Sequence, residues 1–203
     1  MRSRLHERTF VVTSSTHFHI HTHIHNHNHT HTQIIQVPPK YREMNDFYKY
    51  YSGEKVAPVM TIFIGGNHEA SNHLRELYYG GWVAPNIYFM GNSGVINFRG
   101  LRIAGMSGIY SGRNYRRSYD EKLPYNKNDI RSVYHTRELE VKKLCQIKEK
   151  VDIFLSHDWP KGIETYGDTE HLLRRKRHFE RDVRCVGSLS LSQIPNSHTK
   201  YTT

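Results

Sequence analysis

The stretch that most constrains the fold is residues 59–69, VMTIFIGGNHE. Its first six residues are β-formers, and together they are apolar enough to form a buried strand. Two glycines follow, and because glycine accepts backbone conformations that other residues avoid, they allow a sharp turn that presents Asn67, His68 and Glu69. Polar side chains just beyond the carboxyl end of a buried strand occupy the place where open α/β sheets keep their binding sites. This stretch therefore predicts an α/β sheet with a site at one edge.

The same arrangement recurs about ninety residues further on. Residues 151–155 (VDIFL) form a second apolar run, and Ser156, His157 and Asp158 follow it directly. Residues 130–150 precede this run and predict an amphipathic helix, since apolar residues recur at helical spacing with charges opposite. The apolar positions of that helix are Val133, Val141, Leu144 and Ile147. A helix followed at once by a buried strand is typical of an α/β layer.

Weaker patterns predict the remaining elements of a single domain over residues 37–183. Helices are predicted at 40–51, 71–77 and 168–183, a turn at 80–82, and strands at 87–90, 95–98 and 101–104. The last two strands would form a hairpin whose corner is residues 97–100. The aromatic residues of the 40–51 helix are spaced to enter the core, with a base-stacking surface as the alternative.

The two ends of the chain differ from this globular composition. Within residues 1–36, histidine occupies every second position from His17 to His31, eight in all. Such a repeat could chelate Zn, Ni or Cu if it were extended, or it could be the translation of a repeated CA dinucleotide. Residues 184–203 are rich in Ser and Thr and only weakly periodic. We expect both ends to be disordered tails, and we place none of the repeat histidines in a site.

Charge and composition narrow the classes of partner. Twenty-nine Lys and Arg against 19 Asp and Glu give a net charge of +10, which favours a polyanion such as nucleic acid, with a merely basic surface as the alternative. Cys145 and Cys185 are the only cysteines, so a disulfide framework is not expected. No apolar run is long enough to span a bilayer, and we expect a soluble, intracellular protein without a membrane partner.

Residues 105–127 lack periodicity and are long for a loop, and loops of that length are commonly functional. Arginine and lysine alternate here with tyrosine, a combination suited to the phosphates and exposed bases of single-stranded or looped RNA. The candidate RNA-binding residues are Arg113, Tyr115, Arg116, Arg117 and Lys127. A solvated loop is the alternative.

The two polar loops after the buried strands carry groups for metal chemistry. The Asn67 amide oxygen and a neutral His157 imidazole are acceptable ligands for a divalent ion such as Zn, Fe or Mn. His68 could donate a proton, because the charge state of histidine changes near neutrality. Metal-assisted cleavage of a phosphodiester needs these parts. Taken one by one, each residue is weak evidence, and a lone histidine after a strand is more often a hydrogen-bonded structural side chain.

The sequence GGNHE is similar to the Asn-His signature of the calcineurin-like metallophosphoesterases. Longer runs, among them FIGGNHEASNHLRELYYGGWVAPNIYFMG, GLRIAGMSGIY and DIFLSHDWP, resemble one branch of them, the RNA lariat debranching enzymes, and the resemblance covers about residues 37–183. It implies a β-sandwich flanked by helices and a two-metal hydrolase that cleaves the 2′–5′ phosphodiester at intron branch points. It also implies that Asn67 and His157 hold the same metal, that His68 protonates the leaving oxygen, and that residues 105–127 recognise branched RNA in the nucleus.

The chain departs from that family pattern at both ends. The family opens with a strand carrying Asp-or-Cys-x-His and a second strand ending in Gly-Asp, and it closes with His-x-His; none of these is found here. We therefore expect a sandwich truncated at its N-terminal strands and C-terminal end, with at most one partial metal site. An enzyme fragment, a non-catalytic RNA-binding remnant and an incomplete gene model are the three interpretations left open.

Overall fold

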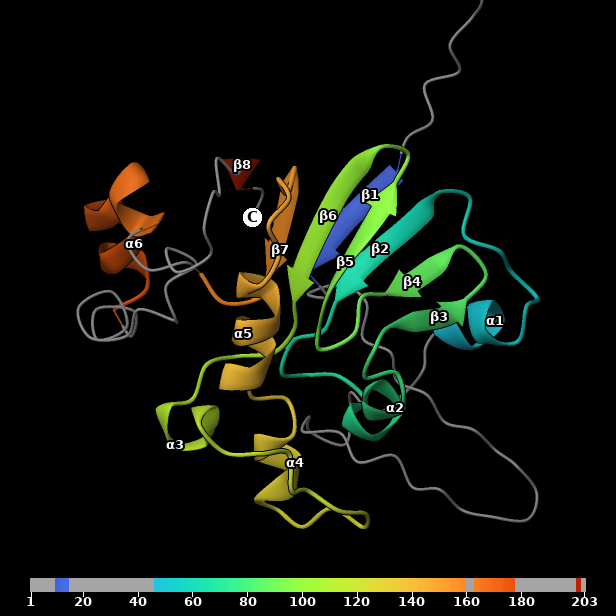
Figure 1. Cartoon of the computed structure of the whole chain (residues 1–203), viewed down its shortest axis with the longest axis horizontal. Coiled ribbons are helices and arrows are strands. Elements are labelled where there is room, and N and C mark those ends of the chain that lie inside the picture. Colours follow the sequence, from blue (N-terminus) through green and yellow to red (C-terminus); the bar gives the residue numbers. More distant parts are fainter. Residues whose placement is uncertain (1–9, 15–45, 160–162, 178–199, 202–203) are drawn as a thin grey trace, which may run out of the picture.

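The structure is a computed structural model that describes residues 10–14, 46–159, 163–177 and 200–201. Over these residues the chain forms two four-stranded sheets (Figure 1). The first sheet has the order β1 (Phe10–Ser14), β2 (Met60–Ile64), β4 (Ile87–Phe89), β3 (Gly81–Ala84). The second has the order β5 (Ser93–Phe98), β6 (Leu101–Met106), β7 (Ile153–Ser156), β8 (Lys200–Tyr201). Each sheet is mostly parallel, with one antiparallel edge strand: β3 in the first and β5 in the second.

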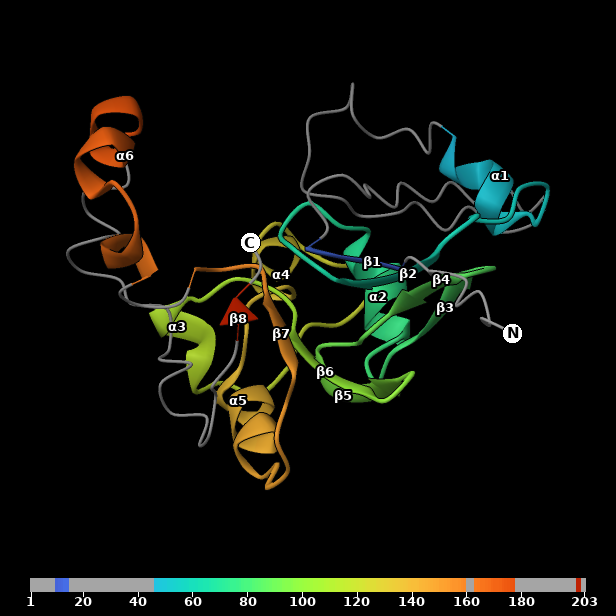
Figure 2. The ribbon, with the colours of Figure 1, turned by 90° about the horizontal axis from the view of Figure 1, so that it is seen from above.

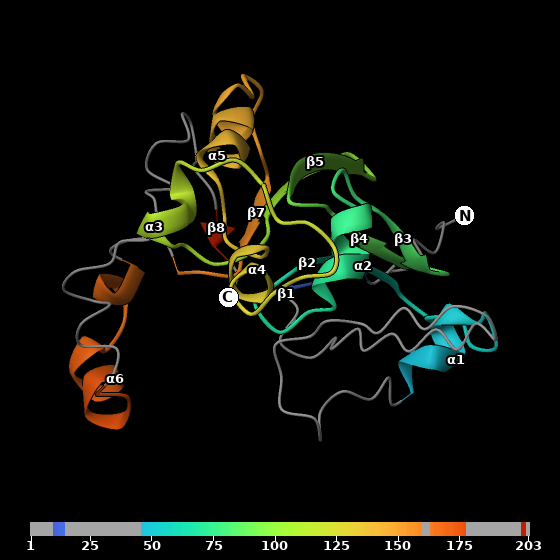
Figure 3. The same ribbon diagram turned by 90° about the horizontal axis from the view of Figure 1, so that it is seen from below.

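Helices cover the outer faces of the sheets and one end of them. The helices α1 (Phe47–Tyr51) and α2 (Ser71–Glu76) lie by the first sheet, and α5 (Glu138–Cys145) lies by the second. Two short helices, α3 (Gly112–Tyr115) and α4 (Asp129–Ser132), lie below the sheets in the view of Figure 1, whereas α6 (Thr169–Arg175), which follows the 3₁₀ helix Ile163–Tyr166, stands apart from the sheets (Figures 2 and 3). No helix in the described part of the chain has the length and apolar character to cross a membrane.

The strand alternation divides the core into layers. On β2, Phe63 points to the cluster under α1 and α2, whereas Ile62 and Ile64 point to a second cluster shared with the other sheet. On β7, Leu155 joins this shared cluster, and Phe154 packs on the opposite face against Leu144 of α5. Because successive side chains of a strand face opposite ways, this pattern places the two sheets face to face with helices outside both.

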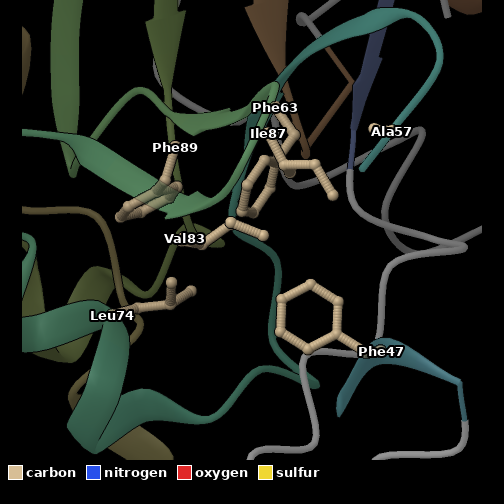
Figure 4. Packing of buried hydrophobic residues seen from close by; sticks show 8 residues of the cluster. Phe47, Ala57, Phe63, Leu74, Val83, Ile87 and Phe89 are labelled. Carbon is tan, nitrogen blue, oxygen red and sulfur yellow. The ribbon is translucent and has the colours of Figure 1, made fainter. Parts of the chain in front are cut away.

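The outer cluster of the first sheet shows how the short helices are held. Phe47 of α1 and Leu74 of α2 pack on Phe63, Val83 and Phe89 of the strands (Figure 4). Phe63 is fully buried, and its ring centroid lies 5.3 Å from that of Phe89. This packing stabilises helices that are too short to be stable alone.

The two sheets approach each other closely at Gly105 of β6. A Cβ there would lie 2.8 Å from both the Ile64 methyl Cγ2 and the Met90 sulfur, so only glycine fits without a shift of the neighbours. This contact brings the carboxyl end of β6 against that of β2, and it thereby fixes which loops meet at that edge.

Most of the predicted elements are confirmed. The apolar runs form β2 and β7, the predicted short helix is α2, and the predicted hairpin is β5–β6. At its corner the Gly100 amide donates to the Asn97 side chain (3.1 Å), and Arg99 and Gly100 both have positive φ. The predicted last helix begins at α6, where the Asp168 side chain caps the helix by accepting the His171 amide (2.8 Å). The α/β class is therefore confirmed.

Three predicted elements differ from the structure. The turn predicted at residues 80–82 is wrong, because Gly81–Ala84 pairs with β4 as a strand. The single helix predicted at 130–150 is two helices, α4 and α5. The chain between them is drawn toward β6 by Thr136, whose amide donates to the Ile109 carbonyl and whose hydroxyl donates to the Ser107 carbonyl. Residues 105–127, predicted as a loop, include the end of β6 and helix α3.

Both predicted tails contain a short described strand. β1 pairs in parallel with β2, and Ser14 lies opposite Ile64 at its end. β1 therefore occupies an edge of β2 that a sandwich without its N-terminal strands would leave unpaired. β8 pairs in parallel with β7. The His repeat, residues 40–45 of the predicted first helix and residues 178–183 of the predicted last helix lie outside the described residues, and the domain limits at 37 and 183 stay predictions.

Candidate functional site

Three loops meet at the carboxyl ends of β2, β6 and β7. The Gly65 amide donates to the Ser107 hydroxyl (3.0 Å), and the Gly108 amide donates to the Gly65 carbonyl (2.8 Å). On the other side, the Tyr110 amide donates to the Asp158 carboxylate. Residues 107–110 therefore join the loop after β2 to the loop after β7, and we call these three loops (65–69, 107–110 and 156–158) the edge loops.

The first edge loop presents Asn67 and His68 on a turn closed by Glu69. Asn67 is half-buried and His68 is exposed. Glu69 is 3% exposed, and its carboxylate accepts the Gly66 amide (3.3 Å). Glu69 therefore stabilises, from the protein interior, the turn that presents Asn67 and His68. The sequence did not predict this role for Glu69.

The third edge loop holds His157 beside Asp158. The His157 Nδ1 atom is buried and has no hydrogen-bond partner among the described residues, although it lies 3.7 Å from an Asp158 carboxylate oxygen. Asp158 is fixed by two contacts: its carboxylate accepts the Tyr110 amide, and its carbonyl accepts the Ser156 hydroxyl (2.8 Å). An imidazole nitrogen without a hydrogen bond is suited to bind a cation.

The chemistry of these groups fits part of a metal site. The Asn67 amide oxygen and the His157 imidazole lie on edge loops joined by residues 107–110, and both donor types suit Zn, Fe or Mn. Among the described residues, no group of three or more His, Cys, Asp or Glu side chains could hold a metal ion. A catalytic zinc site normally keeps three protein ligands, so Asn67 and His157 would supply two of them.

A small cavity of about 40 Å³ lies behind the first two edge loops. Gly65, Gly66 and Glu69 line it from one loop and Ser107 and Gly108 from the next. Gly108 has a φ of +89°, and a Cβ on it would lie 2.1 Å from the Tyr134 carbonyl oxygen. The conformation of this edge loop therefore requires glycine.

The predicted RNA-binding residues divide into two groups. Tyr115, Arg116 and Arg117 line one wall of a groove of about 310 Å³, which we call the basic groove. Its other wall is the start of α5, with Glu138, Leu139 and Lys142, and the almost fully buried Arg137 also lines it. Arg113 and Lys127 are exposed but do not line the groove.

An ion-pair and aromatic network anchors residues 119–121 to the body of the protein. The Tyr119 ring lies between two guanidinium groups, that of Arg75 at 4.0 Å and that of Arg137 at 4.7 Å from its centroid. Arg137 also pairs with Glu121 (2.6 Å), and both side chains are almost fully buried, at 2% and 3% exposure. Burial, aided by the nearby Glu140 charge, raises the pKa of Tyr119 far above its usual range. Sequence reasoning missed this network because its members are distant in sequence and follow no period.

Two histidines near these elements have pKa values below the ordinary value for histidine. Burial lowers the pKa of His135, and the Arg137 charge lowers it further. The His135 Nδ1 atom lies 2.7 Å from the Asn114 side-chain nitrogen, so His135 accepts this hydrogen bond from α3 when it is neutral. Burial likewise lowers the pKa of His73 on α2.

No model of a known protein family matches the chain. Curated proteins do: a lariat debranching enzyme of Arabidopsis thaliana is 60% identical over 149 residues, 73% of this chain and 36% of that protein. The human lariat debranching enzyme is 58% identical over 160 residues, 78% of this chain and 29% of that protein. The Drosophila melanogaster lariat debranching enzyme is 58% identical over 164 residues, 80% and 31% respectively. The chain spans about a third of the length of these relatives.

Proposed function

From the premise that this chain is a relative of the lariat debranching enzymes, we propose that it binds branched RNA at the edge loops and contributes to hydrolysis of the 2′–5′ phosphodiester there. The observation that carries the proposal is the identity of 58–60% over about three quarters of the chain. The sheet arrangement with helices outside both sheets supports a sandwich of the metallophosphoesterase type.

Asn67 and His157 would hold one divalent ion, Fe, Zn or Mn, at the edge loops. Bound there, such an ion would supply Lewis-acid stabilisation of the charge on the scissile phosphate. His157 offers Nδ1, which has no hydrogen-bond partner in the described part of the chain, and Asp158 keeps the loop in place through its contacts with Tyr110 and Ser156. Two ligands are fewer than such a site needs, so we propose that these residues form part of a catalytic site.

We propose that His68 supplies the proton that the reaction requires. In the hydrolysis, water adds to phosphorus, the bond from phosphorus to the 2′ oxygen breaks, and this oxygen must take up a proton. The His68 side chain is exposed beside Asn67, on the turn that Glu69 holds in shape. A protonated imidazole there would donate to the leaving oxygen and would also attract the phosphate.

The experiment compares the full chain with a double variant, Asn67→Ala with His157→Ala, on a labelled branched RNA in the presence of Mn²⁺. We expect Mn²⁺ to tighten binding of this RNA to the wild type and to have less effect on the variant. Binding that ignores both Mn²⁺ and the substitutions would contradict the metal-site proposal. Hydrolysis that depends on both residues would show a complete catalytic site and would overturn the proposal that it is partial.

A non-catalytic RNA-binding protein is the second candidate function, and the basic groove favours it. The groove carries Arg116 and Arg117 beside Tyr115, which is a combination that binds RNA without any metal. RNA binding that is salt-sensitive and unchanged by chelators would support this candidate. In either case we propose a nuclear location, since intron branch points are the implied substrate and the exposed run Arg174 to Arg177 fits a nuclear localisation signal.

A further inference from the structure

We propose that the basic groove is a nucleotide subsite completed by α5, in which Arg116 and Lys142 bind a backbone phosphate and Leu139 and Tyr115 contact a base. This inference rests on the proposed function, because it names where the RNA strand beyond the branch would lie. Neither Leu139 nor Lys142 belongs to the loop that the sequence analysis assigned to RNA. The groove, at about 310 Å³, lies at the lower end of the volumes that small-ligand pockets have.

Two cationic side chains of the groove are available to bind a phosphate. Arg117 is paired with Asp120 (2.8 Å) and Arg137 with Glu121 (2.6 Å), but no carboxylate in the described part of the chain pairs with Arg116. Among the described residues Lys142 is paired only with Glu138, at 3.3 Å, and the lysine side chain is 66% exposed. Exposed pairs of this kind contribute little, so a phosphate can compete for the Lys142 ammonium.

The walls also offer apolar contact. Leu139 is 56% exposed although it is a large aliphatic residue, and it faces the groove from α5. Tyr115 lines the opposite wall. A base lying between an aliphatic and an aromatic side chain would gain contact on both faces, and such contact tolerates any base.

Tyr110 connects the groove to the edge loops. The Tyr115 ring lies 5.7 Å from the ring of Tyr110, whose amide binds Asp158 beside His157. An RNA whose branch lies at the edge loops would therefore pass Tyr110 on its way to Tyr115. The part of the groove that Tyr119 lines is already ordered, because the Tyr119 ring contacts the Arg75 and Arg137 guanidinium groups. Little conformational entropy would therefore be lost there on binding.

The test measures binding of a labelled, single-stranded oligouridylate to the full chain by fluorescence anisotropy over a range of salt concentrations. Lys142→Ala is compared with Lys148→Ala, which removes the same charge from an exposed lysine just beyond α5. We expect Lys142→Ala to weaken binding several-fold and to reduce the salt slope by about 0.7, the value for one lost phosphate contact on a single strand. The control should keep the slope of the wild type.

A third variant, Leu139→Ser, separates apolar from ionic contact. It should weaken binding while the salt slope stays unchanged, because no ion is released at that contact. Equal effects of Lys142→Ala and Lys148→Ala, or an unchanged affinity in Leu139→Ser, would overturn the subsite. If branched RNA still binds in a manner that needs Asn67 and His157, only this inference fails. If the wild type binds neither branched nor linear RNA, the proposed function fails with it.

Discussion

Replacement of Glu121 by Gln should destabilise the protein far more than the same change at its neighbour Asp120. Both carboxylates pair with an arginine at a similar distance, Glu121 with Arg137 at 2.6 Å and Asp120 with Arg117 at 2.8 Å. They differ in burial: the first pair is 2% and 3% exposed, and the second is 54% and 60% exposed. The amide side chains keep the size and remove the charge, so the comparison isolates what burial adds.

The size of the effect follows from what Arg137 would lose. Removal of one partner from a buried ion pair costs about 3–5 kcal/mol, because the remaining charge is left without compensation. Arg137 would still donate to the Asn114 and Ser132 carbonyl oxygens, each at 3.2 Å, so we expect the lower end, about 3 kcal/mol. Asp120→Asn should have little effect, since exposed pairs contribute little.

Urea unfolding followed by circular dichroism measures both variants. With an m value of about 2 kcal/mol per M, the midpoint of Glu121→Gln should fall by about 1.5 M. Amide exchange of residues 111–121 should also become faster, because Arg137 anchors Tyr119. The double variant Glu121→Leu with Arg137→Met should recover most of the loss, since apolar side chains can replace a buried pair. Equal midpoints for Glu121→Gln and Asp120→Asn would show that burial adds nothing to the Glu121–Arg137 ion pair.

Two further predictions concern the backbone and pH. Gly108→Ala should destabilise the protein by more than Gly100→Ala, because both glycines have a positive φ, of +89° and +86°, but only at Gly108 would a Cβ strike a backbone atom, the Tyr134 oxygen at 2.1 Å. We expect about 1–2 kcal/mol at Gly100 from the left-handed conformation alone and a clearly larger loss at Gly108, measured by urea unfolding, and equal losses would contradict the packing of the edge loop. Stability should also fall as the pH drops below 6.5, because the pKa values of His73 and His135 lie below that ordinary value in the folded protein and the unfolded chain then binds more protons. The double variant His73→Gln with His135→Gln should lose part of this dependence, and an identical pH profile would show that neither histidine is held neutral.

The elements that the sequence predicted well are those with a strong local pattern. β2 and β7 are unbroken apolar runs, and the polar residues that follow them do lie on edge loops joined by residues 107–110. Asp168 caps its helix because capping depends only on residues nearby in the chain.

The elements that it missed depend on partners distant in sequence. Gly81–Ala84 is a strand because β4 supplies its hydrogen bonds, whereas its glycine indicates a turn. The helix over 130–150 is interrupted because Thr136 bonds to residues 107 and 109 and because the Arg137 side chain is buried. β1 is a run of β-formers, FVVTS, but it lies beside the His repeat, in a segment that was expected to be disordered.

The residues of the candidate site also divide into those with a local sequence signal and those that depend on distant partners. The residue types and order of Asn67, His68 and His157 pointed to metal and proton chemistry, but their role stays a prediction. Glu69, Tyr119 and Arg137 gave no local signal, because each acts through a buried contact that only the fold creates.

We propose above all that the edge loops recognise an RNA branch. The most direct measurement is the dissociation constant of the full chain for a 2′–5′ branched RNA and for a linear RNA of the same composition, in the same salt and Mn²⁺. We expect tighter binding of the branched RNA, with the difference lost in the Asn67→Ala and His157→Ala double variant. Equal affinity for the two RNAs would contradict it.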